Sequence, residues 1–274
     1  MKNIFNFILP LVFIVSCSME DSSEVSTESV EDRLSKVYYT EFMPCTAGPD
    51  YTSENMTSMI AEWQKLLTNE NLQGVWGYAP AVATNSFPDN GWWEIQWGSK
   101  EEAQEAWSEW SQNKEAAAWN EKYASVLQCD ESLINGFESV FPIASAQYSE
   151  LPDSGYFYGE VHICELNDGS TQEEAISFLS GFTEAVANAD YSDTSYHLGN
   201  YFNVDESGGF LWANFTNSEE SMNKANTSFE ASVRETMFPI FSTFASCGEV
   251  PDLYHGFTLY NADDKDFMPT FPSN

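Results

Sequence analysis

Two glutamates and one histidine are the side chains whose types and spacing favour proton-transfer chemistry. Glu160 and His162 are separated by one residue in the segment 157–164 (FYGEVHIC), so they lie on one face of a β-strand. Glu41 occupies the equivalent position in a similar segment, and the candidate catalytic residues are therefore Glu41, Glu160 and His162. His162 could instead ligate haem or a metal ion. The structural alternative is that all three are hydrogen-bonded residues at sheet ends that take part in no reaction.

An internal repeat links these candidates. The segment 38–45 (YYTEFMPC) returns as 157–164, and alignment on the cysteines gives the pairs Tyr39 and Tyr158, Glu41 and Glu160, and Cys45 and Cys164. Further matches are 91–97 with 209–215, 99–103 with 217–221, Cys129 with Cys247, and 135–137 with 255–257. A repeat of this length indicates that one supersecondary unit has been duplicated.

Each copy predicts the element order βαββαβ. Strands are expected at 37–45, 74–82, 92–97 and 133–141, and again at 156–164, 195–204, 209–215 and 253–260. Helices are expected from residue 52 or 53 to about 67, from Ser99 to about 127, at 171–189, and at 218–246 with a break at Pro239. Capping boxes are predicted at Ser99 with Glu102 and at Ser170 with Glu173.

This order is the split βαβ, or ferredoxin-like, plan, in which two helices cover one face of a four-stranded antiparallel sheet. The first strand and the second helix then finish at the same end of the unit. That geometry places Cys45 beside Cys129 and Cys164 beside Cys247, so we expect one disulfide within each repeat. The alternative is four buried free thiols.

The N-terminus predicts export. Lys2 precedes an apolar run from Ile4 to Val15 that is too short to span a bilayer comfortably, which is typical of a secretory signal peptide. Residues 14–17 (IVSC) resemble the lipobox of bacterial lipoproteins, and the resemblance implies cleavage before Cys17 and lipidation of its sulfur. Ser18 would favour the outer membrane where the cell has one. The alternative is an ordinary signal peptide with an incidental cysteine.

Composition excludes some function classes. The formal net charge is −33, with 10 Lys and Arg against 43 Asp and Glu, so binding to nucleic acid or directly to anionic lipid is not expected. Residues 18–36 are rich in serine and acidic residues and predict a disordered tether. No P-loop, glycine-rich dinucleotide motif, serine elbow or metal-ligand spacing is present in the sequence, so we expect no metal site and no cofactor.

The element order and the repeat resemble the dimeric α/β-barrel superfamily, which includes the antibiotic-biosynthesis monooxygenase-like (ABM) domains. The resemblance covers residues 37–141 and 155–260. It implies an α+β fold in which two tandem ferredoxin-like units pack their antiparallel sheets face to face as a pseudo-dimeric α/β barrel. The expected divisions are a signal peptide (1–16), the lipidated cysteine and tether (17–36), a first repeat (37–150), a second repeat (151–262) and a tail (263–274).

Strand alternation then predicts the lining of the barrel interior. Phe157, Val161 and Ile163 are expected to face the helices, as are Trp93, Ile95 and Trp97. The residues expected to point inward are Tyr39, Glu41, Met43, Trp92, Glu94, Gln96, Tyr158, Glu160, His162, Phe210, Trp212 and Asn214. Of these, the expected ligand-binding residues are Tyr39, Glu41, Trp92, Glu94, Tyr158, Glu160, His162 and Trp212.

Three functions are compatible with the sequence. The first is a membrane-anchored envelope lipoprotein that binds a small apolar or aromatic molecule. The second is an enzyme similar to the cofactor-independent monooxygenases of the superfamily, with Glu160 and His162 transferring protons. The third is an interaction lipoprotein with a closed, dry barrel and a protein partner in the envelope. The sequence contains no catalytic motif that matches the enzymes of this superfamily residue by residue. We therefore rank binding or interaction above catalysis.

Overall fold

A computed structural model describes residues 28–144, 146–205 and 208–272. The predicted signal peptide (1–16), Cys17 and most of the predicted tether lie outside the described residues. Within the described ranges, none of the helices combines the length and the apolar character that a bilayer crossing requires.

The first half of the described chain alternates strands with helices. Its strands are β1 (Tyr38–Ala47), β2 (Leu72–Pro80), β3 (Gly91–Trp97), β4 (Leu127–Cys129) and β5 (Asn135–Ile143). Its helices are α2 (Ser53–Trp63), α3 (Lys100–Gln112) and α4 (Lys114–Tyr123), with short 3-10 turns at Gln64–Leu66 and Glu131–Leu133. The two short elements β4 and Glu131–Leu133 were not predicted.

The second half follows the same order. Its strands are β6 (Tyr156–Leu166), β7 (His197–Asn203), β8 (Gly209–Thr216), β9 (Ala245–Cys247) and β10 (Asp252–Asn261). Its helices are α5 (Gln172–Ala187), α6 (Glu219–Ser228) and α7 (Arg234–Phe244). A π-helical turn, Phe229–Val233, joins α6 to α7.

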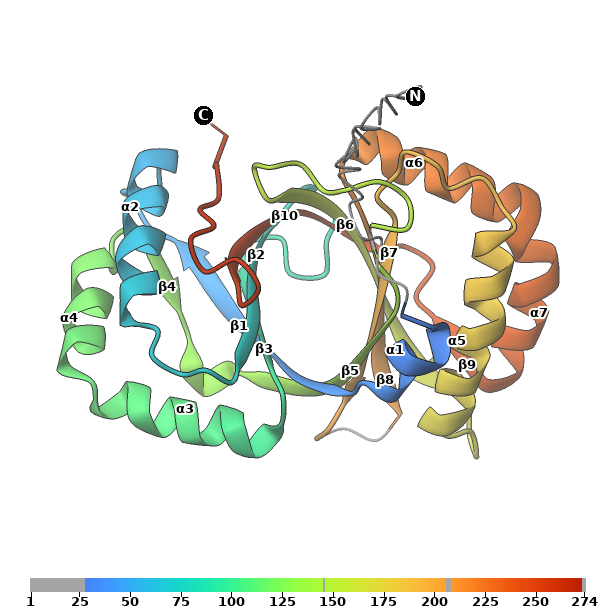
Figure 1. The fold of residues 1–274 in the computed structure, drawn as a ribbon, viewed down its shortest axis with the longest axis horizontal. Coiled ribbons are helices and arrows are strands. Elements are labelled where there is room, and N and C mark those ends of the chain that lie inside the picture. The colour runs from blue at the N-terminus through green and yellow to red at the C-terminus, as the bar shows by residue number, and fades with distance from the viewer. Residues whose placement is uncertain (1–27, 145, 206–207, 273–274) are drawn as a thin grey trace, which may run out of the picture.

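Eight of the strands close into one antiparallel barrel. The order around it is β10, β2, β3, β1, β5, β7, β8 and β6, and β6 pairs with β10 to complete the ring. The seams between the halves are β5 with β7 and β10 with β2, so the last strand of each half pairs with the second strand of the other. Helices α2, α3 and α4 cover the outside of one side of the barrel, and α5, α6 and α7 cover the outside of the other (Figure 1). The described strands of the two halves therefore form one closed sheet, because they pair directly at both seams.

Helix boundaries follow local capping. Ser99 accepts a hydrogen bond from the backbone N–H of Glu102, which is one half of the predicted capping box. The predicted helix divides at Asn113, whose side chain caps α4. The second predicted capping box lies one residue later, at Thr171 with Glu174. The break predicted at Pro239 is wrong, because Pro239 lies inside α7 and the irregular turn precedes it at Phe229–Val233.

A short helix replaces part of the predicted tether. Helix α1 (Val30–Ser35) begins after Ser29, which accepts a hydrogen bond from the backbone N–H of Asp32. Arg33 is buried, and its Nε donates to the carbonyl oxygen of Pro142 at 2.8 Å. This contact fixes α1 to the end of β5, because the guanidinium N–H groups need partners once they leave water.

Both predicted disulfides are confirmed. Cys45 bonds to Cys129 and Cys164 bonds to Cys247. In each half the second cysteine lies on a three-residue strand that pairs with the first strand of that half. Each bridge therefore joins the end of the second helical segment to the sheet. Two disulfides indicate an oxidising, exported environment.

Candidate functional site

In the structure, most of the residues predicted to line the barrel interior lie on its outer face, under the helices. The prediction is correct for β3, where Trp92 and Glu94 point inward and Trp93, Ile95 and Trp97 pack in the first helical core. It is wrong for β1, because Tyr39, Glu41 and Met43 face the helices and Phe42 packs inside the barrel. It is also wrong for β6 and β8, since Tyr158, Glu160, His162, Phe210, Trp212 and Asn214 lie on the helix side while Phe157, Val161 and Ile163 face inward.

Two features explain the reversal. Both faces of the barrel are buried and aromatic, so apolar side chains on alternate positions do not identify the helix side. For β8, strand pairing places Trp212 opposite His162 and Trp93 opposite Met43, so Trp212 is equivalent to Trp93 and the sequence alignment of these strands was displaced by one residue. A shift of one residue moves every side chain of a strand to the other face.

The cysteines carry the signal that would have given the correct face. Each disulfide lies on the helix side, because the partner cysteine follows the helices. Counting back in steps of two from Cys164 reaches His162 and then Glu160, and counting from Cys45 reaches Met43 and Glu41. These residues share the face of their cysteine.

Aromatic rings largely fill the barrel interior, and the carboxyl group of Glu94 lies among them. Tyr78 and Tyr201 both donate hydrogen bonds to Glu94, the latter at 2.9 Å to Oε1. Burial raises the pKa of Glu94 to about 7, and the two hydroxyl donors only partly oppose this. The remaining space in the barrel is about 200 Å³. The predicted ligand cavity therefore does not lie here.

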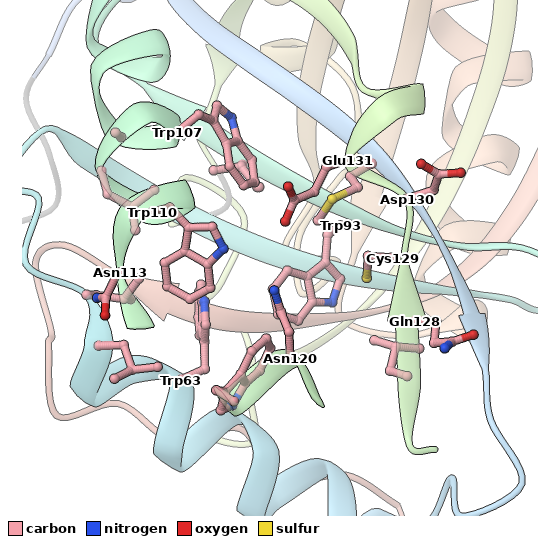
Figure 2. A pocket seen from close by; sticks show the side chains of 18 of the residues that line it. Trp63, Trp93, Trp107, Trp110, Asn113, Asn120, Gln128, Cys129, Asp130 and Glu131 are labelled. Atoms are coloured by element: carbon pink, nitrogen blue, oxygen red, sulfur yellow. The ribbon is translucent and has the colours of Figure 1, made fainter. Parts of the chain in front are cut away.

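Larger cavities lie outside the barrel, between each side of the sheet and its helices. In the first half, Glu41 lies beneath α3, where its Oε2 accepts hydrogen bonds from Nε1 of Trp97 at 3.0 Å and of Trp107 at 2.7 Å. Burial raises the pKa of Glu41, and these two indole donors and the charge of Lys100 oppose it without cancelling it. The adjoining space, which we call the first-half cavity, measures about 780 Å³; Trp63, Trp93, Trp97, Trp107, Trp110 and Trp119 line it (Figure 2).

In the second half, the equivalent glutamate accepts hydrogen bonds from three side chains. Glu160 Oε1 lies 3.2 Å from His162 Nε2 and 3.2 Å from Asn214 Nδ2, and its Oε2 accepts from Asn226 Nδ2 at 2.9 Å. Burial acts to raise the pKa of Glu160, but the donors, His162 foremost, outweigh it and hold the pKa below its usual value. The carboxylate is therefore ionised at neutral pH.

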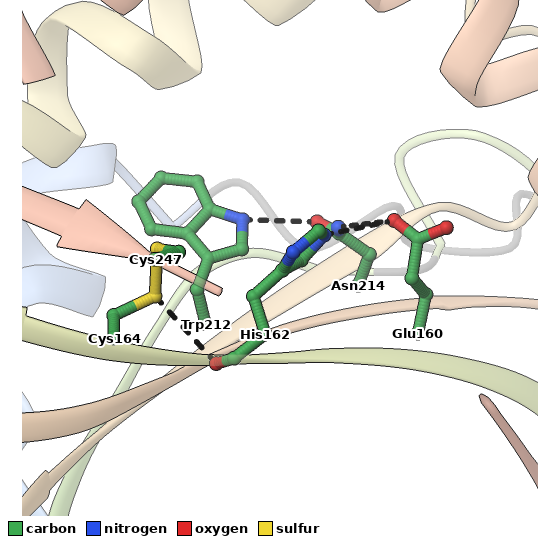
Figure 3. The surroundings of a disulfide bond; sticks show 6 residues. All are labelled: Glu160, His162, Cys164, Trp212, Asn214 and Cys247. Atoms are coloured by element: carbon green, nitrogen blue, oxygen red, sulfur yellow. Dashed lines mark hydrogen bonds and ion pairs between the residues drawn. A yellow bond between two sulfur atoms is a disulfide. The ribbon is translucent and has the colours of Figure 1, made fainter. Parts of the chain in front are cut away.

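Other side chains orient these donors. Asn214 Oδ1 accepts from Tyr196 at 2.8 Å and from Trp212 Nε1 at 3.1 Å, which leaves the amide nitrogen directed at Glu160. Figure 3 shows Glu160, His162, Asn214 and Trp212 rising from the sheet on the same side as the Cys164–Cys247 disulfide. Because an ionised carboxylate only accepts, His162 must carry its proton on Nε2. Its Nδ1 then has no hydrogen-bond partner among the described residues.

This network lies at the wall of a cavity of about 550 Å³, which we call the second-half cavity. Its aromatic lining consists of Phe178, Phe182, Tyr191, Tyr196, Trp212, Phe229, Phe238 and Phe241. Its polar lining residues are Glu160, His162, Asn167, Asn214, Asn226, Arg234, Ser242, Ser246 and Glu249. An aromatic chamber with a few convergent polar groups is the usual composition of a small-molecule site.

Of the eight predicted ligand-binding residues, only Glu160, His162 and Trp212 line this cavity. Tyr158 lies farther along β6 beside His255, while Tyr39 and Glu41 belong to the first half and Trp92 and Glu94 to the barrel. Asn226 and Tyr196 were missed. The repeat contained the signal for Asn226, because it follows Glu160 by 66 residues and Trp107 follows Glu41 by the same number.

No group of three His, Cys, Asp or Glu side chains within the described ranges is arranged to hold a metal ion. The Glu160–His162 pair has two members and is occupied by internal hydrogen bonds. It is suited to orienting a proton acceptor, since the carboxylate fixes one ring nitrogen and leaves the other for a ligand.

Comparison with solved structures identifies the class of fold. No protein-family model and no curated protein matches the chain. A candidate monooxygenase of Lactobacillus acidophilus NCFM aligns with a TM-score of 0.50 and 8% identity over 81% of this chain and 94% of that chain. An anthrone oxidase-like protein aligns with a TM-score of 0.50 and 13% identity over 85% and 96% of the two chains.

A chlorite dismutase of Candidatus Nitrospira defluvii aligns less well, with a TM-score of 0.46 and 14% identity over 86% and 97% of the two chains. These neighbours belong to the dimeric α/β-barrel superfamily. The chain therefore has a mixed α+β fold with a closed antiparallel barrel of that kind. At these identities the likeness concerns the fold alone.

Proposed function

We propose that the second-half cavity binds a small aromatic molecule that carries an O–H or N–H group. The observation that carries the proposal is the convergence of His162, Asn214 and Asn226 on one ionised glutamate at the wall of a phenylalanine-rich chamber. The aromatic rings would hold the apolar body of the ligand by burial and edge-to-face contacts. The free Nδ1 of His162 would accept the hydrogen bond of the ligand.

The geometry of the chamber supports this assignment. The Trp212 and Phe182 rings lie at 4.9 Å and 87°, and the Phe178 and Phe241 rings at 5.8 Å, so the walls are preassembled. The side chains of Glu160 and His162 keep 11% and 27% of their surface exposed. The polar pair is thus mostly buried but still accessible to a ligand. Because the walls are already packed, binding would cost little conformational entropy of the protein.

A ligand titration tests this proposal. The probes are 1-naphthol and 1-methoxynaphthalene, which share a ring system but differ in the ability to donate a hydrogen bond. Isothermal titration should show tighter binding of naphthol, and His162→Phe or Glu160→Gln should weaken it by about tenfold or more while barely changing methoxynaphthalene binding. Glu41→Gln, the matched change in the first half, should leave both affinities unchanged. Equal affinity for the two probes, or no binding of either, would refute the proposal.

Proton transfer is a second candidate function, favoured by the 3.2 Å contact between His162 Nε2 and Glu160. A base oriented by a carboxylate can remove the proton of a phenol-like substrate, as in an enzyme similar to the cofactor-independent oxygenases. Two of the structural neighbours are described as a candidate monooxygenase and an anthrone oxidase-like protein. Aerobic turnover of a phenolic substrate that survives Glu160→Gln would remove this assignment.

We also propose that the protein is an envelope lipoprotein, anchored through lipid on Cys17, built as a tandem pseudo-dimer of two ABM-like repeats. The lipobox-like segment 14–17 and the two disulfides support export, and the shared strand order of the two halves supports duplication. Metabolic labelling with a lipid precursor should label the wild type and not Cys17→Ser. Equal labelling of both proteins would contradict lipid attachment at Cys17. If pull-down of this protein recovers another envelope protein while the second-half cavity holds no ligand, the interaction role is favoured instead.

A further inference from the structure

The first-half cavity differs in chemistry from the second-half cavity and lies outside the proposed function. It occupies about 780 Å³ between β1, β3 and the helices α2, α3 and α4. Six of the nine tryptophans of the chain line it, together with amide side chains at Asn69, Asn90, Asn113, Asn120 and Gln128. So many indole rings in one place need a reason, because leucine or phenylalanine fills a core equally well.

The rings are arranged as a continuous aromatic wall. The centroids of Trp63 and Trp93 are 5.1 Å apart, and Trp119 lies 6.5 Å from Trp93 and 6.1 Å from Trp110. Trp107 closes the side toward α3, where its N–H is held by Glu41. Figure 2 shows the rings of Trp107, Trp110 and Trp93 bordering one space.

The charged groups at this cavity all have one sign. Glu109, Asp130 and Glu131 line it, and no lysine, arginine or histidine is among its described lining residues. Asp130 caps the following 3-10 turn and its carboxylate points away from the rings, whereas Glu131 reaches toward Trp107 and Trp93 (Figure 2). Glu131 makes no ion pair or hydrogen bond through its side chain with any other described residue.

The second-half cavity lacks this combination. It contains Arg234 and His162, and its described aromatic walls are phenylalanine and tyrosine with a single tryptophan. Indole is the strongest of the aromatic rings in cation–π attraction, and cages of such rings recognise quaternary ammonium groups. A carboxylate without a counter-ion at the mouth of the cage adds a favourable field for a positive charge.

We propose that the first-half cavity binds an organic cation whose nitrogen carries apolar substituents, of the quaternary ammonium class. The substituents would pack against the indole faces of Trp93, Trp107 and Trp110. The positive charge would face these rings and the carboxylate of Glu131. A fully substituted nitrogen has no N–H to donate, so the indole faces and the carboxylate can hold it without a direct hydrogen bond.

The test uses a pair of probes that differ in one atom. Choline carries the charged nitrogen, and 3,3-dimethylbutan-1-ol has carbon in its place. Isothermal titration of the disulfide-bonded protein should show choline binding at least tenfold tighter than the neutral alcohol. Raising the salt concentration should weaken choline binding and leave the alcohol unaffected.

Variants locate the site. Trp110→Phe should weaken choline binding and Trp110→Leu should weaken it further, because the ring quadrupole falls and then disappears. Glu131→Gln should weaken choline binding by several-fold, while Glu121→Gln, on an exposed part of α4 outside the cavity, should not. Equal affinity of the two probes for the wild type, absence of choline binding, or equal effects of the Glu131 and Glu121 variants would overturn the proposal. His162→Phe should leave choline binding intact, which separates this site from the proposed function of the second half.

Discussion

Glu41 and Glu160 occupy the same position in the two halves of the barrel, but their surroundings give them opposite ionisation tendencies. Each lies four residues before the cysteine of its strand, on the same strand face. Each also accepts a hydrogen bond from a helical residue 66 positions later. In the first half both donors are indoles and burial prevails, so the pKa of Glu41 is raised. In the second half a histidine and two amides prevail over burial, so the pKa of Glu160 is lowered.

The difference shows that a duplicated backbone position does not preserve a chemical role. Indole groups supply one N–H each and a large apolar surface, whereas His162, Asn214 and Asn226 supply polar donors with less apolar cover. One half has become a tryptophan-lined chamber beside a buried glutamate whose pKa is raised, and the other a chamber with an ionised glutamate at its wall. We therefore expect removal of either disulfide to change the stability of the protein by the same amount. Substitution of the two glutamates should change its stability in opposite directions.

The largest expected effect concerns the disulfides. Cys45 and Cys129 are 84 residues apart, and Cys164 and Cys247 are 83 apart. Replacing either pair by serines should lower the free energy of unfolding by about 4 kcal/mol, because the entropy of closing a loop in the unfolded chain depends on loop length. Urea unfolding monitored by tryptophan fluorescence checks this. A clear inequality between the two double variants would show that the halves differ in native packing at the bridges.

The second effect concerns the glutamate inside the barrel, where residues from both halves meet. Glu94 from β3 is held by Tyr78 from β2 and Tyr201 from β7. Its pKa is about 7 in the folded protein against 4.5 for an unperturbed glutamate, so stability is lost as the pH rises from about 4.5 to 7 and is constant above that. The loss corresponds to about 3 kcal/mol.

Glu94→Gln should remove this pH dependence and make the protein more stable than the wild type at pH 8 but not at pH 4.5. Urea midpoints of the two proteins at several pH values give the comparison. Parallel wild-type and variant curves across this window would contradict a raised pKa.

The smallest effect is the opposite response of the paired glutamates. The lowered pKa of Glu160 contributes stability that is complete above pH 4.5 and is lost as the pH falls through the folded pKa. The raised pKa of Glu41 has the reverse sign, because stability falls as the pH rises above 4.5 toward its folded pKa. At pH 7, Glu160→Gln should therefore cost about 1 to 3 kcal/mol by leaving its donors poorly matched.

Glu41→Gln should be neutral or slightly stabilising at the same pH, since it removes a buried charge. Thermal or urea unfolding of both single variants and of the double variant gives the measurement, with additivity expected for separate cores. Equal destabilisation in the two single variants would contradict the different environments inferred for Glu41 and Glu160.

The repeat and the cysteines determined much of the architecture in advance. The order βαββαβ, both disulfide pairings and the cap at Ser99 follow from local patterns and from the equivalence of the two copies. These features depend on hydrogen bonds and spacing within one unit, which the chain encodes nearby. The face of each strand was predicted wrongly for β1, β6 and β8, because hydrophobicity separates faces only where one of them meets water.

Tertiary structure decided where ligands can be held. Closure through β5 with β7 and β10 with β2 brings aromatic side chains of both halves into the barrel and fills it. The open volumes remain beneath the helices, at about 780 Å³ in the first half and about 550 Å³ in the second. The sequence by itself placed Glu160 and His162 on one strand face and listed Trp212 among the ligand-binding residues, but it assigned all three to the barrel interior. Only the folded chain added Asn226 and Tyr196, because contacts between a helix, a loop and a sheet depend on packing across long separations.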